Sequence, residues 1–302
     1  MSLIREFQYS KILTSNAQEK TVTFLGKIKG EDAILKLEKT PFATETSEID
    51  AFFAKNTISD IKELASNDVY HWGVSLLEQT LQNPTCKYSL VYPATETHIA
   101  KFETAAYHMI SETPEHYQNV VKPYISTMQG DRLKWVRNIL FEGAEAERVV
   151  YRNDDREKGF VLVPDMKWDG TTLDTLYICA IVLREDIASI RDLKREHVNW
   201  LNGMQDEIKA GVAKYYGNKI KGDELRIFVH YQPSYYHFHI HIVNISHPGL
   251  ASTMSVGRAV LLQDVIDQLE YLEDGIASRT LTYALAENHK LWDLGLKYAT
   301  RG

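Results

Sequence analysis

A short run in the last quarter of the chain, residues 237–243 with the sequence HFHIHIV, alternates three histidines with apolar residues. The run is rich in β-branched and aromatic residues, which favour a strand. Successive side chains of a strand point to opposite faces, so the pattern predicts three imidazoles on one face and an apolar face behind them. Neighbouring imidazoles would lie about 6.6 Å apart at the usual strand rise. Such a row indicates a chemical site on a rigid scaffold.

The histidine row has three interpretations. It could be purely structural, or two of its imidazoles could bind one metal ion. The first and third histidines would stand about 13 Å apart, which disfavours one ion shared by all three. No carboxylate closely flanks the row, and the chain has no Cys-x-x-Cys. In the third interpretation a neutral imidazole nitrogen attacks phosphorus, while its neighbours contact phosphate oxygens or donate a proton.

Composition limits the partners of this site. The 302 residues carry a net charge of −7 and are 44% hydrophobic, which is typical of a globular protein with an ordinary core. An acidic chain is a poor sequence-independent binder of long nucleic acids, because these need a basic face. A small anionic ligand held by a few local cations remains compatible with this charge.

The sequence shows no signal for export or for membrane insertion. Cys86 and Cys179 are its two cysteines, too few for a disulfide framework, which favours a reducing compartment. The N-terminal residues do not resemble a signal peptide, and no run of roughly 18 apolar residues exists. We therefore expect a cytoplasmic protein without membrane contact, with the nucleus as an open alternative. Neither a phosphate-binding G-x-x-x-x-G-K-[ST] loop nor a G-x-G-x-x-G motif is present.

The elements that must position the histidines follow from local patterns. In the first half, a helix is expected from the N-cap signal at Ser66-Asn67-Asp68 to about Leu81. A second helical stretch is expected from His98 to Met128, with a new helix start near Thr113-Pro114. The predicted strands of this half are 21–25, 33–37 and 88–92.

The second half is richer in strands. The predicted strands are 148–151, 160–164, 176–183, 225–231, 238–245 and 280–285, and the predicted helices are 189–216 and 258–272. Pro233 indicates a tight bend just before the histidine run. Strand runs with few βαβ units favour an α+β fold over a doubly wound sheet.

Sequence blocks around the histidine run identify a family. The run itself fits the histidine-triad pattern of nucleotide hydrolases and transferases. Together with its lead-in and four other blocks, it resembles the scavenger mRNA decapping enzymes of that superfamily. These blocks are VHYQPSYY at 229–236, VPDMKW at 163–168, WVRNIL at 135–140, AEAER at 144–148 and YPATE at 92–96. They occur in the family's order, and the resemblance extends from about Ser66 to Leu285.

The resemblance implies a reaction and roles for four histidines. The family hydrolyses the short capped fragments left by 3′-to-5′ mRNA decay and releases 7-methylguanosine monophosphate. By position in the motif, His239 would be the nucleophile and would form a covalent nucleotidyl-imidazole. His237 and His241 would flank it, and His230 would lie near the phosphates. No metal and no cofactor is implied.

The resemblance also implies a substrate site. Trp135 would stack on the positively charged 7-methylguanine, and Met166, where the family often has leucine, would close the other side. Glu145 and Asp165 would lie near the base edge and the ribose. The remaining substrate contacts implied are Lys101, Lys167, Arg258, Ser234 and Tyr235 at the phosphates, and Asn67 and Tyr70 closing over the cap. Outside this context, Trp135 would be an ordinary core residue and Asp165 and Lys167 an ordinary solvated turn.

The resemblance also implies a domain organisation and an assembly. Residues 1–100 would be a smaller, mostly β domain that closes over the cap and dimerises, residues 101–113 a helical hinge, and residues 114–302 the catalytic histidine-triad domain with an antiparallel sheet and helices. The implied assembly is a homodimer with exchanged N-terminal domains, with a heterodimer with a paralogue as an alternative. The implied ligands are capped dinucleotides and short capped RNA.

Two other functions stay open at this point. An intact triad could persist in a cap-binding paralogue that turns over slowly and regulates an active relative. A general histidine-triad hydrolase of dinucleoside polyphosphates is the other alternative. Trp135, Glu145 and Asp165 argue against the latter, because that chemistry does not need a pocket for a charged, methylated guanine.

Overall fold

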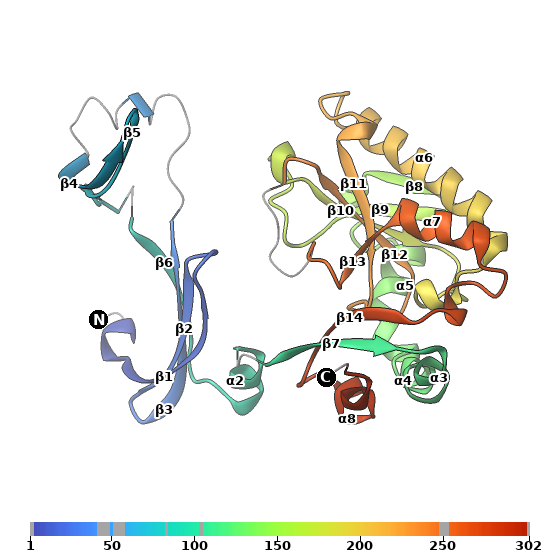
Figure 1. Cartoon of the computed structure of the whole chain (residues 1–302), viewed down its shortest axis with the longest axis horizontal. Coiled ribbons are helices and arrows are strands. Elements are labelled where there is room, and N and C mark those ends of the chain that lie inside the picture. The colour runs from blue at the N-terminus through green and yellow to red at the C-terminus, as the bar shows by residue number, and fades with distance from the viewer. Residues whose placement is uncertain are drawn as a thin grey trace. The chain divides into compact units, whose positions relative to one another are not determined.

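The structure, a computed structural model, describes residues 3–40, 49–50, 58–81, 84–102, 105–247 and 254–300 (Figure 1). The chain divides into two compact units, residues 1–104 and 105–302. In its described residues the first unit is built mainly from strands, and a short helix lies near its end. The second unit carries the histidine run.

An antiparallel sheet with the order β1-β2-β3-β6 forms the first unit's core. Its strands are β1 (Gln8–Asn16), β2 (Thr21–Ile28), β3 (Glu31–Lys39) and β6 (Cys86–Val91). Lys29 and Gly30 both have positive φ, as the tight turn between β2 and β3 requires. Ile28, Ala33 and Ile34 are fully buried. Helix α2 (Glu96–Phe102) follows the sheet.

The predicted helix over residues 66–81 is wrong. This segment forms a hairpin of β4 (Ile58–Asn67) and β5 (Tyr70–Leu77), joined by a turn in which Asp68 has a φ of 52°. Asn and Asp favour tight turns as strongly as helix N-caps, so this signal was ambiguous. The deciding pattern is the alternation of large apolar residues from Tyr70 to Leu76, which has the period of a strand.

The second unit is centred on a six-stranded antiparallel sheet with the order β13-β11-β12-β10-β9-β8. Its strands are β8 (Tyr151–Asn153), β9 (Phe160–Pro164), β10 (Tyr177–Val182), β11 (Leu225–His230), β12 (His239–Asn244) and β13 (Ala259–Leu261). The predicted combination of antiparallel sheets and helices is confirmed.

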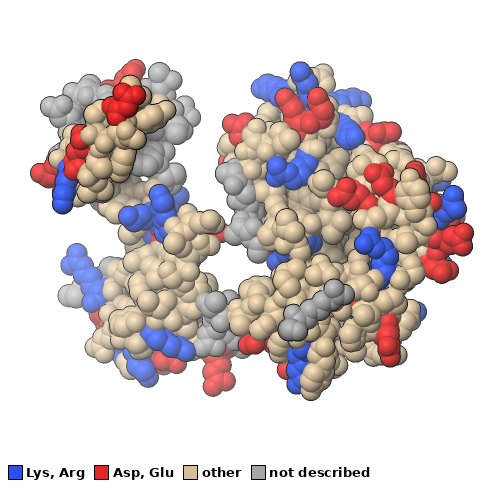
Figure 2. Space-filling model, in the orientation of Figure 1, with Lys and Arg blue, Asp and Glu red and all other residues tan. Residues whose placement is uncertain are grey.

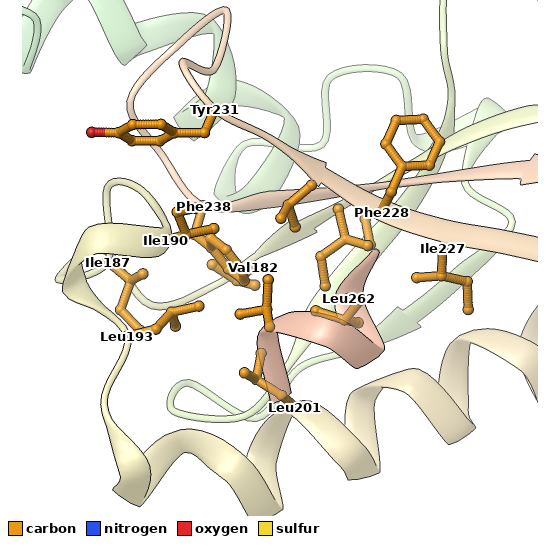
Figure 3. Close-up of a cluster of buried hydrophobic side chains, with 14 of the residues drawn as sticks. Val182, Ile187, Ile190, Leu193, Leu201, Ile227, Phe228, Tyr231, Phe238 and Leu262 are labelled. Carbon is orange, nitrogen blue, oxygen red and sulfur yellow. The ribbon is translucent and has the colours of Figure 1, made fainter. Parts of the chain in front are cut away.

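Helices cover both faces of this sheet. Helices α6 (Val198–Tyr215) and α7 (Leu262–Tyr271) pack on one face, where Val182 and Ile227 meet Leu201 and Leu262 (Figure 3). Helix α5 (Lys134–Phe141) packs on the other face, against alternate residues of β9 and β10. Because strand side chains alternate, one face holds the larger apolar core and the opposite face carries the catalytic candidates.

A second, two-stranded sheet pairs β7 (Tyr107–Glu112) with β14 (Leu281–Ala286). Strand β7 contradicts the expectation of helix throughout 98–128, because its partner lies far away in the sequence. The predicted helix start is confirmed: Thr113 accepts a hydrogen bond from the His116 backbone amide, 3.2 Å away. The short helices around this sheet are α3 (Pro114–His116), α4 (Lys122–Thr127) and α8 (Lys290–Asp293).

Two predicted helices begin later than expected. Residues 259–261 form edge strand β13 before α7, because they pair with Phe228, Val229 and His230 of β11. The segment from Ser189 contains two 3-10 turns, and α6 begins only at Val198. Among the residues that the structure describes, no helix is long and apolar enough to cross a membrane. On the visible face of the second unit, basic side chains are interspersed with acidic ones (Figure 2).

Candidate active site

Three imidazoles form a row across adjacent strands of the second unit. His239 and His241 belong to β12, and His230 ends β11. The ring centroids of His239 and His241 are 5.0 Å apart, and those of His241 and His230 are 4.1 Å apart. Phe228 pairs with His241 in the strand register, so His230, two residues further along, faces the same side. All three side chains are buried.

The backbone determines the protonation of His239. Its Nδ1 lies 2.7 Å from the carbonyl oxygen of His237. A carbonyl oxygen can only accept, so Nδ1 must carry the proton and Nε2 must keep its lone pair. Burial, assisted by the neighbouring His230 and His237, lowers the pKa of His239 to about 4. The imidazole is therefore neutral at physiological pH, with Nε2 able to act as a nucleophile.

A buried tyrosine favours the opposite tautomer for His241. The phenol oxygen of Tyr177 lies 2.9 Å from Nδ1 of His241. Burial raises the pKa of Tyr177, so its hydroxyl stays protonated and can donate to Nδ1. The proton of neutral His241 then belongs on Nε2, which is buried and has no hydrogen-bond partner within the described part of the chain. Burial also lowers the pKa of His241 well below its ordinary value.

His237 lies outside this row. Strand β12 begins only at His239, and Nε2 of His237 donates to the carbonyl oxygen of Val182, 2.7 Å away. Burial lowers the pKa of His237, so this imidazole is also neutral. The expectation that all three histidines of the run line one face of a strand is therefore wrong at His237, which contributes its carbonyl to His239.

His239 and His241 open into a cavity of about 480 Å³. This volume is within the usual range for small-molecule sites. The predicted site residues that line it are Trp135, Glu145, Asp165, Met166, Lys167, His230, Ser234, Tyr235, His239 and His241. They come from five separate segments of the chain, which the sheet and α5 bring together.

Aromatic side chains form the wall next to His239. The ring of Tyr235 stacks on the His239 imidazole, with centroids 3.9 Å apart and planes inclined by 11°. Trp135, on α5, meets Tyr235 edge to face at 4.8 Å and is 45% exposed. Met166 is 90% exposed although it lines the cavity. The cavity therefore offers a flat ligand aromatic surface and a flexible thioether.

Charged groups also line the cavity. Glu145 has a φ of 59° and pairs with Arg148 at 2.6 Å. Asp165 accepts a hydrogen bond from the backbone amide of Lys167 at 2.9 Å, which closes the turn after β9. The Lys167 ammonium lies 5.9 Å from the centre of the Tyr177 ring. The cavity thus combines carboxylates and a cation with the aromatic wall.

Three residues of β10 that sequence reasoning missed also line the cavity: Tyr177, Cys179 and Ile181. Cys179 pairs with His241, and Ile181 pairs with His239, across the sheet. Their alternation was visible in the sequence, but the strand pairing that places them beside the histidines was not. Burial raises the pKa of Cys179 to about 12, so this thiol is not a nucleophile at neutral pH.

Four predicted contacts lie elsewhere. Arg258 lines a neighbouring cavity. Asn67 and Tyr70 face each other at the tip of the β4–β5 hairpin in the first unit. Lys101 belongs to α2, and its side chain lies outside the described residues. No group of three or more His, Cys, Asp or Glu side chains suited to a metal ion occurs within the described ranges.

Known protein families match both units of the chain. Residues 2–105 match the N-terminal model of the scavenger mRNA decapping enzymes. Residues 134–257 match the model described as scavenger mRNA decapping enzyme C-term binding. The second match includes Trp135 and the complete histidine run.

Similar proteins with curated names cover almost the whole chain. A protein of Schizosaccharomyces pombe named m7GpppX diphosphatase is 41% identical over 97% of this chain and 95% of its own length. Proteins of the same name from Bos taurus and Homo sapiens are 38% and 37% identical. These alignments cover 94% and 95% of this chain and 83% and 84% of the bovine and human proteins.

Proposed function

Because this chain belongs to the scavenger mRNA decapping enzyme family, we propose that it is an m7GpppX diphosphatase. Its substrates are m7GpppN and short capped oligonucleotides left after 3′-to-5′ mRNA decay. Its products are 7-methylguanosine monophosphate and a nucleoside diphosphate or a short RNA. The observation that carries this proposal is the cavity in which neutral His239 lies beneath Tyr235, among carboxylates and a lysine.

We propose His239 as the nucleophile. Its Nε2 attacks the phosphorus next to 7-methylguanosine, and the bond from that phosphorus to the bridging oxygen breaks. The leaving nucleoside diphosphate departs as an anion. The Nε2–H of His241 donates a hydrogen bond to a phosphate oxygen as charge develops there, and Lys167 and Arg258 offset the remaining charge. Support comes from the opposite proton positions of His239 and His241.

Hydrolysis completes the cycle. Water attacks the same phosphorus, the bond to Nε2 breaks, and 7-methylguanosine monophosphate is released. The water oxygen becomes an oxygen of the product phosphate, which keeps one of the water protons, and the other proton passes to solvent. The Nδ1–H bond to the His237 carbonyl can persist through both steps, which keeps the ring in place for the next substrate.

We assign base selection to the aromatic wall. The cationic ring of 7-methylguanine is expected to stack on Trp135 and to be covered by Met166. Glu145 and Asp165 can accept hydrogen bonds from the guanine edge and the ribose. Unmethylated guanine lacks the ring charge, so it forfeits the cation–π part of this interaction.

In this proposal the first unit acts as a lid and as a dimerisation element. The hinge to the histidine-triad domain lies within the predicted range 101–113, ahead of β7, because β7 pairs with β14 in the second unit. The β4–β5 hairpin of the first unit supports an exchanged homodimer. Tyr70, Trp72, Val74 and Leu76 alternate along β5, and each is more than half exposed. A two-stranded ribbon with an open apolar face is marginal in water, so a second copy of the chain is the proposed cover. Light scattering tests this: a mass of two chains supports the dimer, and a mass of one contradicts it.

In the proposed dimer, Asn67, Tyr70 and Lys101 contact the cap from the first unit. We place the reaction in the cytoplasm, a reducing compartment in which the free thiols of Cys86 and Cys179 can persist. Fractionation of cells that produce the tagged protein tests this placement. Recovery of the protein only from the secreted or organelle fractions would contradict it.

Hydrolysis of m7GpppG in ¹⁸O-labelled water tests the proposed reaction directly. The proposal predicts 7-methylguanosine monophosphate and GDP, with the label in the monophosphate, because water attacks the phosphorus next to the methylated nucleoside. Label in GDP, or release of 7-methylguanosine diphosphate and GMP, would contradict the assignment. A protein that binds m7GpppG without turning it over would instead be a regulatory cap-binding relative.

A further inference from the structure

Two segments of the chain carry the carboxylates of the cavity, Glu145 and Asp165. Asp165 directly follows β9, whose last residue, Pro164, pairs with Ile178 of β10, so this segment is fixed by the sheet. Glu145 lies in the loop after α5, ahead of the first residue of β8, Tyr151. The strand ladder therefore does not set the position of the Glu145 carboxylate relative to Asp165.

The side chain of Arg148 connects the two segments. Its Nη1 donates to Oε2 of Glu145 at 2.6 Å, and its Nη2 donates to the carbonyl oxygen of Pro164 at 3.3 Å. The donors of a guanidinium group form a planar, rigid fork, so one group can fix two acceptors relative to each other. Glu145 and Pro164 line the cavity and Arg148 does not, so Arg148 acts from behind the cavity wall.

The backbone around Glu145 closes the same turn. Glu145 has a φ of 59°, in the left-handed region that residues with a side chain rarely adopt. The amide of Arg148 donates to the Glu145 carbonyl at 2.9 Å, so the backbone and the side chain of Arg148 both bond to Glu145. Each side chain of the pair is 37% exposed, so water screens this pair less than a fully exposed one.

A carboxylate held in this way can still accept bonds from a ligand. It has about four lone-pair positions, and Arg148 uses one of those on Glu145. The guanine edge presents two donors, the ring N1–H and the exocyclic amine, and both are satisfied only when the carboxylate has one orientation. A free glutamate side chain would lose rotamer freedom on binding, and a pre-oriented one loses less.

We propose that Arg148 is a positioning residue that determines selectivity for guanine. Its guanidinium holds the Glu145 carboxylate against the fixed end of β9, so that the carboxylate meets both donors of the base edge. This inference rests on the proposed function and adds to it a residue that does not itself touch the substrate.

A cap analogue that lacks one donor tests this role. In m7IpppG, 7-methylhypoxanthine replaces 7-methylguanine and lacks only the exocyclic amine. The measured quantity, the selectivity ratio, is kcat/KM for m7GpppG divided by kcat/KM for m7IpppG. It should be about tenfold or more in the unaltered protein, because the analogue leaves a charged acceptor without its partner.

Arg148→Met keeps an apolar stem of similar length and removes the fork. It should reduce the selectivity ratio to about threefold or less, mainly through a higher KM for m7GpppG, with kcat nearly unchanged because Arg148 touches no reacting atom. Glu145→Gln should lower the ratio as well. The double variant should match Glu145→Gln alone, because Arg148 acts through Glu145.

Arg152→Met is the matched control. Arg152 also joins a carboxylate to a backbone carbonyl, with Asp154 at 2.5 Å and Leu140 at 2.6 Å, and neither acceptor lines the cavity. It should leave the selectivity ratio unchanged.

The outcomes separate this inference from the function on which it rests. If Glu145→Gln lowers the selectivity ratio and Arg148→Met does not, the inference is overturned and the proposed function stands. A double variant with a clearly lower ratio than Glu145→Gln would also overturn it, because Arg148 would then act independently. A ratio near one in the unaltered protein would instead refute the reading of the guanine edge in the proposed function, and this inference with it.

Discussion

At the scale of single residues, the site depends on where protons lie. His239 and His241 are both neutral, yet a carbonyl places the proton of one on Nδ1 and a tyrosine places that of the other on Nε2. The alternating run predicted an imidazole face, and it did so from local pattern alone. It could not predict the contact of His241 with Tyr177, which lies 64 residues away in the sequence. Nor could it predict that His237 bonds to the Val182 carbonyl instead of joining the row.

Tyr177→Phe tests the orientation of His241. The change removes one hydroxyl from a buried position and frees the imidazole to adopt either tautomer. We expect kcat to fall about five- to tenfold, the value of roughly one hydrogen bond, with little change in KM. Steady-state kinetics on m7GpppG measure both constants. An unchanged kcat would show that His241 does not need this partner.

Trp135→Ala tests the recognition of the methylated base. Loss of the aromatic face should raise KM for m7GpppG by about tenfold or more, because a desolvated cation–π contact is worth roughly 2 kcal/mol. KM for unmethylated GpppG should rise less, since its base carries no charge. The measurement is the ratio of kcat/KM values for the two caps, and Trp135→Phe should retain part of the preference. An unchanged ratio in Trp135→Ala would refute the stacking role.

At the scale of elements, strands with strong alternation were predictable and their partners were not. Residues 160–164, 176–183, 225–231 and 280–285 form strands close to the predicted bounds. Strand β7 was missed because its pairing with β14 overrides a locally helical pattern. The β4–β5 hairpin was missed because Asn and Asp serve turns as well as helix caps.

A buried charge links β7 to β14, to the 3-10 turn of Arg191 and to the segment that follows β11. Glu112, at the end of β7, is fully buried and lies 2.6 Å from Arg191 and 2.6 Å from the Tyr231 hydroxyl. It also accepts hydrogen bonds from Tyr283 and Gln232. Tyr231 and Gln232 begin the segment that carries Ser234 and Tyr235, so Glu112 anchors the wall of the cavity.

Glu112→Gln should therefore destabilise the protein strongly. The substitution leaves the buried Arg191 guanidinium without its counter-charge, at a cost of about 3–5 kcal/mol in the free energy of unfolding. Urea titration measures this free energy. Glu287→Gln, which alters an exposed pair with His108, should have a small effect by comparison. Equal effects of the two substitutions would contradict the anchoring role.

At the scale of the whole molecule, buried imidazoles couple stability to pH. Burial lowers the pKa of six histidines in the second unit: His197, His237, His239, His241, His247 and His289. Between the ordinary pKa of 6.5 and the lowered values, the unfolded chain binds more protons than the folded one. The contribution of these histidines to the free energy of unfolding is therefore fully present above pH 6.5, and it is lost as the pH decreases towards 4.

Thermal melts between pH 7.5 and 4.5 should show this fall, within the range set by the ordinary and lowered pKa values of His239. His239→Asn removes one of the contributing groups, so its melting temperature should decline less steeply over the same range. A slope equal to that of the unaltered protein would show that His239 is not held neutral by the fold. The proposed dimer could not be derived from periodicity or composition, because no local pattern encodes what covers the exposed β4–β5 hairpin of the first unit.

The most direct test of the central claim is turnover of m7GpppG by the unaltered protein and by His239→Asn, both in excess chelator. If the neutral Nε2 of His239 is the nucleophile, the unaltered protein releases 7-methylguanosine monophosphate in chelator at its ordinary rate. The variant is expected to keep the cavity and to bind m7GTP, but to lose at least about a thousandfold in kcat, as expected when a nucleophile is removed. Turnover retained by His239→Asn, or lost from the unaltered protein on chelation, would contradict the account.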